Sequence, residues 1–223
     1  MAAKVWKPGC PEWEEDIENS PARKQRKHVF NKVVTEDCRN PPSAQMARVW
    51  HQELFDNLVP HSDYLGKFRD VEKTSRCLNG YDVRVDDAVA VLHESVLEEV
   101  DTFFEAFRSK VKALDQIWRL RGGAYPVEDI DQVVGLAAWA HGEWVGIHPF
   151  ANGNGRTAHL WANYVFCRYD FGPVVILRPR PGQPYGVFSR ISMKSANHEP
   201  IKGLFWVLLA RSYPESADIM PPF

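Results

Sequence analysis

The sequence predicts a mostly helical fold with one short β-hairpin. Apolar side chains recur at helical spacing along several stretches after Ser43, and the single pair Asn79-Gly80 is typical of a two-residue hairpin turn. There is no internal repeat. The chain has 223 residues, of which 44% are hydrophobic and 25% charged, so it suits one domain with an adequate core and not a disordered chain.

The helices follow from the apolar pattern in chain order. Ser43 is a typical N-cap, and it precedes a helix whose apolar face contains Met46, Val49, Trp50 and Leu54. The Asn79-Gly80 hairpin comes next, over residues 74–86. Further helices are expected over residues 89–112, 127–146, 154–169, 185–196 and 200–212.

Residues 1–43 differ from residues 44–223, which we expect to form the main domain. Several prolines, among them Pro21 and Pro41, are expected to break up any long helix in this extension. It is expected to pack partly through Trp6, Trp13 and Phe30. Its basic run, residues 23–27, is best interpreted as a solvated face, and a contact with nucleic acid or acidic lipid is a weaker alternative.

Composition excludes several classes of protein. The net charge of −2 argues against a general nucleic-acid binder. The longest apolar runs, 133–140 and 204–210, fall far short of the roughly 18 residues of a membrane span. The four cysteines are scattered without a CxxC pair, which indicates neither a zinc site nor a disulfide framework. With no apolar leader at the N-terminus, a reducing cytoplasmic location is expected.

The segment between the two most apolar helices combines residue types that suit phosphate chemistry. Gly153 and Gly155 flank Asn154 where a helix begins, and glycines permit a close approach to a ligand. The first amides of a helix have no carbonyl partner, so such a loop binds anions, most often phosphate. Arg156, in the first turn, suits a phosphate, and His148 accepts a proton near neutral pH. A plain turn between core helices explains each residue singly, but the whole set favours a phosphate site.

This segment, HPFANGNGRTAH, resembles the signature of the Fic (filamentation induced by cAMP) family in the Fic/Doc group, His-x-Phe-x-Asp/Glu-Gly-Asn-Gly-Arg-x-x-Arg. The two agree at His148, Phe150, Gly153, Asn154, Gly155 and Arg156. Upstream, residues 64–69 (YLGKFR) resemble the family's Trp-Ala-Gly-x-Tyr/Phe-Arg stretch, and Asn79-Gly80 falls where the family has a target-docking flap. The resemblance leaves residues 1–43 unexplained.

The resemblance implies an all-α compact helical bundle with one small β-hairpin flap. It implies transfer of AMP from ATP to a Ser, Thr or Tyr hydroxyl of a target protein, with Mg²⁺. His148 becomes the general base and Phe150 the core anchor of the loop. The positions implied for nucleotide binding are Gly153, Asn154, Gly155, Arg156 and His159. The flap, residues 74–85, is expected to hold the target by strand addition, through Leu78, Asn79, Gly80, Tyr81 and Val83.

Two departures from the family pattern bear on the chemistry. Asn152 stands where the family has an acidic metal ligand, so Mg²⁺ is expected to bind weakly and Mn²⁺ to be possible in its place. His159 stands where the second Arg belongs, which keeps other donors open, namely UMP, GMP, phosphocholine or phosphate transfer. Intact Gly155 argues against kinase action, because the Doc-type kinases have Lys near that position. A degenerate, toxin-like nucleotide-binding scaffold is a further alternative, against which the retained His148 argues.

No complete inhibitory Ser/Thr-x-x-x-Glu-Gly/Asn pattern is found. Glu18-Asn19 ends it correctly, but Glu14 stands where Ser or Thr belongs. An inhibitor on a separate, antitoxin-like chain or no such inhibition is therefore expected. The other expected partner is the target protein, with no membrane and no nucleic acid.

Overall fold

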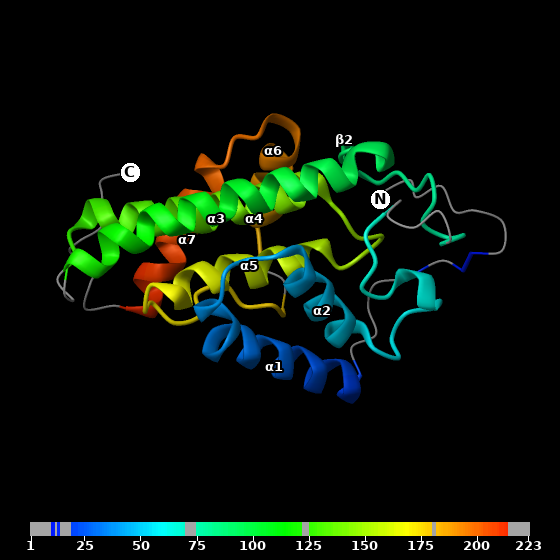
Figure 1. Cartoon of the computed structure of the whole chain (residues 1–223), viewed down its shortest axis with the longest axis horizontal. Coiled ribbons are helices and arrows are strands. Elements are labelled where there is room, and N and C mark those ends of the chain that lie inside the picture. The colour runs from blue at the N-terminus through cyan, green and yellow to red at the C-terminus, as the bar shows by residue number, and fades with distance from the viewer. Residues whose placement is uncertain are drawn as a thin grey trace.

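The molecule is built around one helix, α4, against which several others pack. The computed structural model describes residues 10, 11, 13, 19–69, 75–121, 125–179 and 182–213. Its α-helices are α1 (Ser20–Thr35), α2 (Ala44–Phe55), α3 (Val96–Arg121), α4 (Val127–Ile147), α5 (Asn154–Arg168), α6 (Tyr185–Ser195) and α7 (Glu199–Ser212). Helix α4 contacts α3, α5, α6 and α7, while α1 contacts α2 and α5 (Figure 1). This arrangement confirms the predicted all-α fold.

Most predicted helices agree with the observed ones. Ser43 Oγ accepts a hydrogen bond from Met46 N at 3.2 Å and so caps α2. The expectation of a helix over residues 89–112 is wrong at both ends. The end of strand β2 (Ala88–Val89) and the 3₁₀ turn η3 (His93–Ser95) occupy its start, and α3 runs on to Arg121.

Helix α1 lies within the segment that was expected to be broken by prolines. Asn19 Oδ1 accepts a hydrogen bond from Ala22 N at 2.9 Å, and Pro21 lies in the first turn, where its missing N–H costs nothing. Val29 and Val33 of α1 are fully buried. Pro21 therefore begins this helix without breaking it, and the apolar face of α1 joins the common core.

Two further 3₁₀ turns, η1 (Asp37–Arg39) and η2 (Ser62–Tyr64), flank α2. Trp13, in the segment before α1, is buried as expected. Other expectations fall outside the described residues, namely those for Trp6, Glu14, Glu18 and Thr74.

The hairpin lies later in the chain than predicted. Strand β1 (Arg84–Val85) pairs antiparallel with β2 (Ala88–Val89), and residues 86–87 form its turn. Asn79-Gly80 ends a separate turn, with Gly80 at φ 64°. The placement of the hairpin at Asn79-Gly80 is therefore wrong, because the turn that Gly80 ends in a left-handed conformation has no strand next to it.

The side chains that were expected to grip a target point into the protein. Leu78, Tyr81 and Val83 are 1%, 1% and 2% exposed. The observed hairpin is instead held from outside, because Arg190 and Lys194 of α6 pair with Asp86 and Asp87 of its turn. These three side chains are therefore part of the core, and the role of this region in docking a target stays a prediction.

Aromatic side chains fill the space between α3, α4 and α5. The rings of Trp144 and Trp161 lie 5.9 Å apart, and Phe104 packs against both. Phe150, in the loop after α4, lies 6.0 Å from Trp144. The core thus extends directly under this loop. None of the described helices is long and apolar enough to cross a membrane.

Two glycines of α4 allow a sharp test of this packing. A Cβ on Gly142 would lie 2.1 Å from His198 Nδ1, whereas a Cβ on Gly146 meets nothing within 4 Å. Gly142→Ala must therefore displace His198, whose Nε2 lies 2.9 Å from Glu143 Oε1. We expect Gly142→Ala to lower the free energy of unfolding by about 1–3 kcal/mol. Gly146→Ala, the matched control, should raise it by about 0.5–1 kcal/mol, as Ala does in helix interiors. Equal effects in urea denaturation would contradict this packing.

Candidate active site

The loop between α4 and α5 reverses the chain through two left-handed residues. His148 ends α4 at φ 54° and ψ 54°, and its N–H donates to Trp144 O at 3.0 Å. Gly153 precedes α5 at φ 80°. The short loop therefore places the end of one buried helix beside the start of the next.

His148 is half-buried, and its hydrogen bond indicates which ring nitrogen is basic. Nδ1 lies 3.1 Å from Val145 O. A carbonyl only accepts, so Nδ1 carries the proton in this contact and the lone pair of the neutral ring is on Nε2. The αL backbone and this bond together fix the direction of the ring.

Phe150 anchors the loop, as the family resemblance implies. Its side chain is fully buried and stacks on the ring of His51 from α2, with centroids 3.9 Å apart. His51 Nε2 lies 3.0 Å from Asn152 O, and His51 Nδ1 accepts from Gly66 N at 3.1 Å. Burial lowers the pKa of His51 to about 3, so this neutral ring joins α2, the loop and the segment after η2.

Asn154 holds the loop closed from within. Its Oδ1 accepts from Phe150 N at 2.9 Å, and its Nδ2 donates to Phe150 O at 2.8 Å. Thr157 reinforces the start of α5, because its hydroxyl accepts from Trp144 Nε1 at 2.7 Å. The Asn154 side chain therefore shapes the loop, and any part it takes in phosphate binding is through its backbone.

The two glycines of the loop have different surroundings. A Cβ on Gly153 would lie 2.4 Å from Phe55 Cε2, whereas a Cβ on Gly155 meets nothing within 4 Å. Gly153 is thus required by the fold. Gly155 faces open space at the first turn of α5, where a helix presents amides with no carbonyl partner.

The side chain of Asn152 contacts the loop backbone and Trp13. Its Oδ1 accepts from Gly153 N at 2.6 Å, and its Nδ2 lies 3.5 Å from Trp13 O. Its side chain is 5% exposed. The arrangement gives Asn152 a structural role, and the metal role stays a prediction.

Arg156 lies at the edge of the site. Its guanidinium carbon sits 4.4 Å from the centre of the Phe55 ring, a cation–π distance. Phe55 therefore supports Arg156 and also excludes a side chain at Gly153. One aromatic ring thus couples the arginine to the shape of the loop.

His159 points into the interior. Its Nε2 lies 2.7 Å from the Tyr185 hydroxyl, which is also 2.8 Å from Nε2 of His141. The side chain of His159 is 3% exposed. The structure therefore does not bring this residue to the open side of the loop with Gly155 and Arg156.

Arg69 positions the site, a role that the sequence reasoning did not assign. Its guanidinium donates to four backbone oxygens at 2.7–3.0 Å, those of Tyr81, Val91, Ile147 and His148. The backbone N–H of Arg69 donates to Pro149 O at 2.7 Å. The available signal was its place in the YLGKFR stretch, next to an apolar Phe68, since an arginine there must either reach water or find several acceptors.

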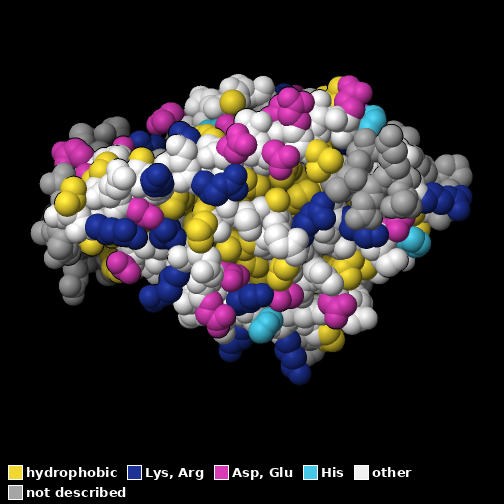
Figure 2. Space-filling model, in the orientation of Figure 1, with side chains coloured by type: hydrophobic (Ala, Val, Ile, Leu, Met, Phe, Trp, Pro, Cys, Tyr) yellow, Lys and Arg dark blue, Asp and Glu magenta, His cyan; other side chains and the backbone are white. Residues whose placement is uncertain are grey.

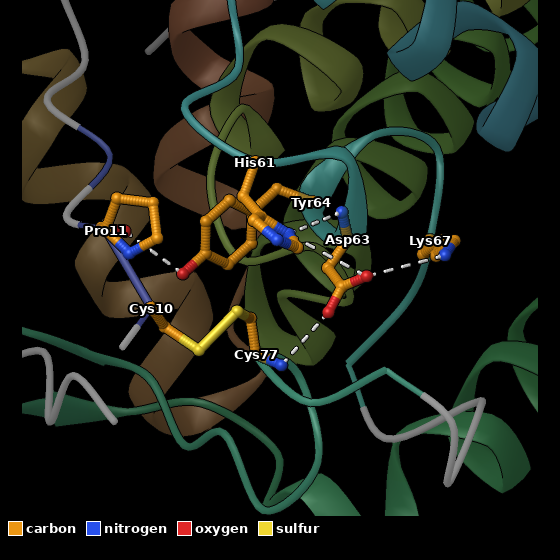
Figure 3. Close-up of a disulfide and its surroundings, with 7 residues drawn as sticks. All are labelled: Cys10, Pro11, His61, Asp63, Tyr64, Lys67 and Cys77. Carbon is orange, nitrogen blue, oxygen red and sulfur yellow. Dashed lines mark hydrogen bonds and ion pairs between the residues drawn. A yellow bond between two sulfur atoms is a disulfide. The ribbon is translucent and has the colours of Figure 1, made fainter. Parts of the chain in front are cut away.

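A disulfide joins the N-terminal segment to the region before the hairpin. Cys10 and Cys77 are bonded, with Cα atoms 5.5 Å apart, which corrects the expectation that the cysteines form no disulfide (Figure 3). Spacing alone could not show this pair, because 67 positions separate the two residues. Beside it, Tyr64 donates its hydroxyl hydrogen to Pro11 O at 3.1 Å. The clustered ligand atoms of His61, Asp63 and Cys77 form no metal site in this state, since a disulfide sulfur is not a thiolate.

Trp13 connects this disulfide region to the loop. Its ring packs against Tyr64, His51 and Phe55 at 5.9, 5.8 and 5.0 Å between centroids. Its carbonyl is the oxygen that lies near Asn152 Nδ2. Trp13 therefore belongs to the wall of the site.

The two loop glycines generate one prediction. Gly153→Ala combines a left-handed φ with a clash against Phe55, so we expect a loss of at least about 2 kcal/mol in the free energy of unfolding. Gly155→Ala should leave stability unchanged within about 0.5 kcal/mol or raise it, because Ala favours helix there. Chemical denaturation of the two variants side by side measures this difference, and equal losses would contradict the geometry.

His51 generates a prediction on pH. Its pKa falls from 6.5 in the unfolded chain to about 3 in the fold, so the unfolded state binds the extra proton between these values. Stability should therefore fall as the pH drops below about 6.5, by up to about 1.4 kcal/mol per pH unit from this group. His51→Gln should remove that part of the slope, whereas the exposed His28→Gln should not. Identical slopes of unfolding free energy between pH 6 and 4 in all three proteins would contradict the assignment.

Comparison with solved structures supports the fold. A Fic-domain-containing signalling protein from Bacteroides thetaiotaomicron aligns with a TM-score of 0.60 and 18% identity, over 92% of this chain and 73% of that one. Fic-1 from C. elegans aligns with a TM-score of 0.61 and 18% identity, over 96% and 55%. BepC from Bartonella tribocorum, solved with bound AMPPNP, aligns with a TM-score of 0.54 and 17% identity, over 97% and 96%. At these identities the likeness concerns the fold alone.

Curated relatives match a shorter stretch. A protein adenylyltransferase Fic from Drosophila mojavensis is 44% identical over 52 residues, and one from Nematostella vectensis is 51% identical over 41 residues. These matches span 23% and 18% of this chain and only 10% of each relative. Residues 41–166, from the residues before α2 through most of α5, match the Fic/DOC family. With the whole loop and the Arg69 stretch inside that match, the chain belongs to the Fic/DOC family.

Proposed function

We propose that this protein is a protein adenylyltransferase, which moves AMP from ATP to a hydroxyl side chain of a target protein. The proposal rests on two features at the ends of one short loop. At one end the Val145 carbonyl orients the His148 ring, and at the other end the first turn of α5 is open at Gly155. A base and a phosphate cradle are the two parts that such a transfer requires. The names of the curated relatives support the same activity.

In this proposal His148 takes the proton of the attacking hydroxyl. Its Nε2 carries the lone pair in the neutral ring, so it is the nitrogen that accepts this proton. The target oxygen then bonds to the α-phosphorus of ATP, and the bond from that phosphorus to the bridging oxygen breaks. Pyrophosphate leaves with that oxygen, and the modified target retains AMP.

The phosphates are assigned to the backbone amides at the start of α5 and to Arg156. The dipole of α5 favours an anion there. Gly155 leaves the space that a phosphate oxygen requires, and Arg156, resting on Phe55, supplies a forked donor. These groups are fixed before the reaction, which is what stabilisation of a developing charge needs.

The residues present fit a protein-bound Mg²⁺ poorly. Asn152 offers a neutral amide oxygen that already accepts from Gly153 N. Mg²⁺ prefers carboxylates and phosphates, so in this proposal the nucleotide holds it and Asn152 adds little. We assign no step of the transfer to the metal.

The buried position of His159 favours a second candidate for the donor. A residue tied to Tyr185 in the interior is not available to a terminal phosphate in this arrangement. A donor other than ATP, such as another nucleotide or a phosphocholine carrier, is therefore the alternative within the same site. The target protein and a separate inhibitor chain remain part of the proposal. A cytoplasmic location is proposed less strongly, because the disulfide of Cys10 and Cys77 is of a kind that a reducing cytosol disfavours.

The decisive variant is His148→Ala. We expect it to lower transfer of label from [α-³²P]ATP to protein in a lysate at least about a hundredfold, because the general base is lost. Nucleotide binding should persist, since backbone amides and Arg156 hold the phosphates. His28→Ala, on the exposed face of α1, is the matched control and should keep full activity. Transfer at the wild-type rate by His148→Ala would exclude His148 as the base, and binding without any label on protein by the wild type would favour a non-catalytic scaffold.

The metal requirement tests Asn152. Asn152→Asp adds a full charge to the loop, and we expect it to lower the Mg²⁺ concentration for half-maximal transfer by about tenfold, because a carboxylate binds Mg²⁺ better than an amide does. The wild type should be more active with Mn²⁺ than with Mg²⁺, because Mn²⁺ is bound more strongly by nitrogen and oxygen ligands. Superimposable metal titrations of the two proteins would show that Asn152 serves only the loop.

A further inference from the structure

The side chains around the disulfide are of the types that bind metals, and the proposed function assigns them no role. One ligand atom from each of His61, Asp63 and Cys77 lies within 4.8 Å of the other two. Cys10 brings a second sulfur to the same place, because it is bonded to Cys77. Figure 3 shows these four residues together. One imidazole, one carboxylate and two sulfurs, from three separate segments of the chain, therefore meet.

The spacing of these atoms is close to that of a tetrahedral zinc site. Zinc bonds of about 2.0 Å to nitrogen or oxygen and about 2.3 Å to sulfur place neighbouring ligand atoms about 3.3–3.8 Å apart. The observed separations are at most 4.8 Å, so rotations of the side chains can close the difference. The Cα atoms of Cys10 and Cys77 lie 5.5 Å apart, which keeps the second sulfur in reach of the same ion.

Hydrogen bonds hold His61 and Asp63 in the forms that bind a metal. His61 Nδ1 accepts from Asp63 N at 3.1 Å, so its lone pair is on this nitrogen, and a metal ion would take the place of that N–H. Asp63 Oδ2 accepts from Cys77 N at 3.2 Å, while Oδ1 lies 3.8 Å from both His61 Nδ1 and Lys67 Nζ. The backbone thus orients one carboxylate oxygen, and the other faces the histidine, as outer-shell contacts do for metal ligands.

We propose that Cys10, His61, Asp63 and Cys77 bind one Zn²⁺ once the disulfide is reduced. Reduction by a dithiol breaks the S–S bond, adds one hydrogen to each sulfur and leaves the dithiol as its own disulfide. Zn²⁺ then binds both sulfurs as thiolates, and the two protons pass to water. A tetrahedral set that includes thiolate and imidazole suits Zn²⁺ and not Mg²⁺ or Ca²⁺.

The metal and the disulfide are alternative crosslinks between the same segments. Each joins the chain before α1 to the chain before the hairpin, and the metal also includes the turn η2. An oxidising compartment favours the disulfide, whereas a reducing one leaves two thiols for the metal. None of the four residues lies in the loop from His148 to Arg156, so the proposal does not depend on the transfer reaction.

Zinc retention by the full chain in its two redox states provides the test. A phosphine, which becomes its oxide, reduces the disulfide, because a dithiol would itself compete for zinc. We expect the reduced protein to retain equimolar zinc after anaerobic gel filtration and the oxidised protein to retain none, as atomic emission measures. Zinc should also raise the thermal unfolding midpoint of the reduced protein alone. Cobalt(II) in place of zinc should give the intense visible absorption of a tetrahedral site and a thiolate charge-transfer band.

The rest of the described surface offers little competition for the ion. No other group of three His, Cys, Asp or Glu ligand atoms lies so close together among the described residues. On the face seen in Figure 2, Asp and Glu side chains are spread among Lys and Arg side chains. Retained zinc can therefore be assigned to a site by single substitutions.

Cys10→Ser, His61→Ala and Asp63→Asn should each lower the zinc association constant of the reduced protein about tenfold or more, since even outer-shell changes have effects of this size. His28→Ala and Cys167→Ser are matched controls and should leave the constant unchanged. His28 is on the exposed side of α1, and Cys167 is a free cysteine of α5. Thermal unfolding verifies that each variant is folded.

Four results would overturn the proposal. The first is a reduced protein that retains no zinc. The second is equal retention by the oxidised protein, which would show binding without the sulfurs. The third is an unchanged association constant in any of the three ligand variants, which would remove that residue from the site. The fourth is the weak absorption of octahedral cobalt, which is incompatible with a tetrahedral set of these ligands.

Discussion

The buried guanidinium of Arg69 is the interaction on which the arrangement of the site depends. A helix ends with carbonyls that have no N–H partner and with the negative end of its dipole. Arg69 donates to two such oxygens at the end of α4, those of Ile147 and His148, and to two more in the chain on either side of the hairpin, those of Tyr81 and Val91. Burial lowers its pKa to about 10, so it remains charged at neutral pH and binds all four acceptors as a cation. One side chain thereby caps α4, orients the backbone of His148 and fixes the hairpin region beside it.

The loop itself shows a division between side chains that build it and atoms that can meet a ligand. Phe150, Asn152 and Asn154 direct their side chains to the core or to the loop backbone. The groups left for a phosphate are chiefly backbone amides, with His148 and Arg156 at the two ends. A rigid loop of this kind does not have to reorganise when charge develops on a bound group, which is the physical basis of the proposed transfer.

The segment before α1 takes part in the same architecture. Trp13 packs on His51 and Phe55, and the disulfide of Cys10 to Cys77 holds its chain near η2. His51 and Phe55 in turn support the loop and Arg156. One layer of aromatic side chains therefore lies between Trp13 and the loop.

The sequence by itself determined the helical class, the cap at Ser43, the extents of α4 to α7 and the identity of the loop from His148 to Arg156. These features depend on local spacing, and local spacing is what a sequence displays. Membership of the family was also visible there, because the loop signature is contiguous. Helix α1 was not predicted, because prolines usually break helices, although Pro21 is tolerated in a first turn.

Only the tertiary structure decided which contacts the remaining residues make. The turn of the hairpin lies at residues 86–87 and not at the predicted Asn79-Gly80, because pairing between strands outweighs the turn preference of a dipeptide. His159, at the position of a family arginine, points inward to Tyr185, and Cys10 is bonded to Cys77, 67 positions away. Arg69 acquired its acceptors from chain segments up to 79 positions away. Such contacts depend on distances in space between residues remote in sequence, and no local pattern encodes them.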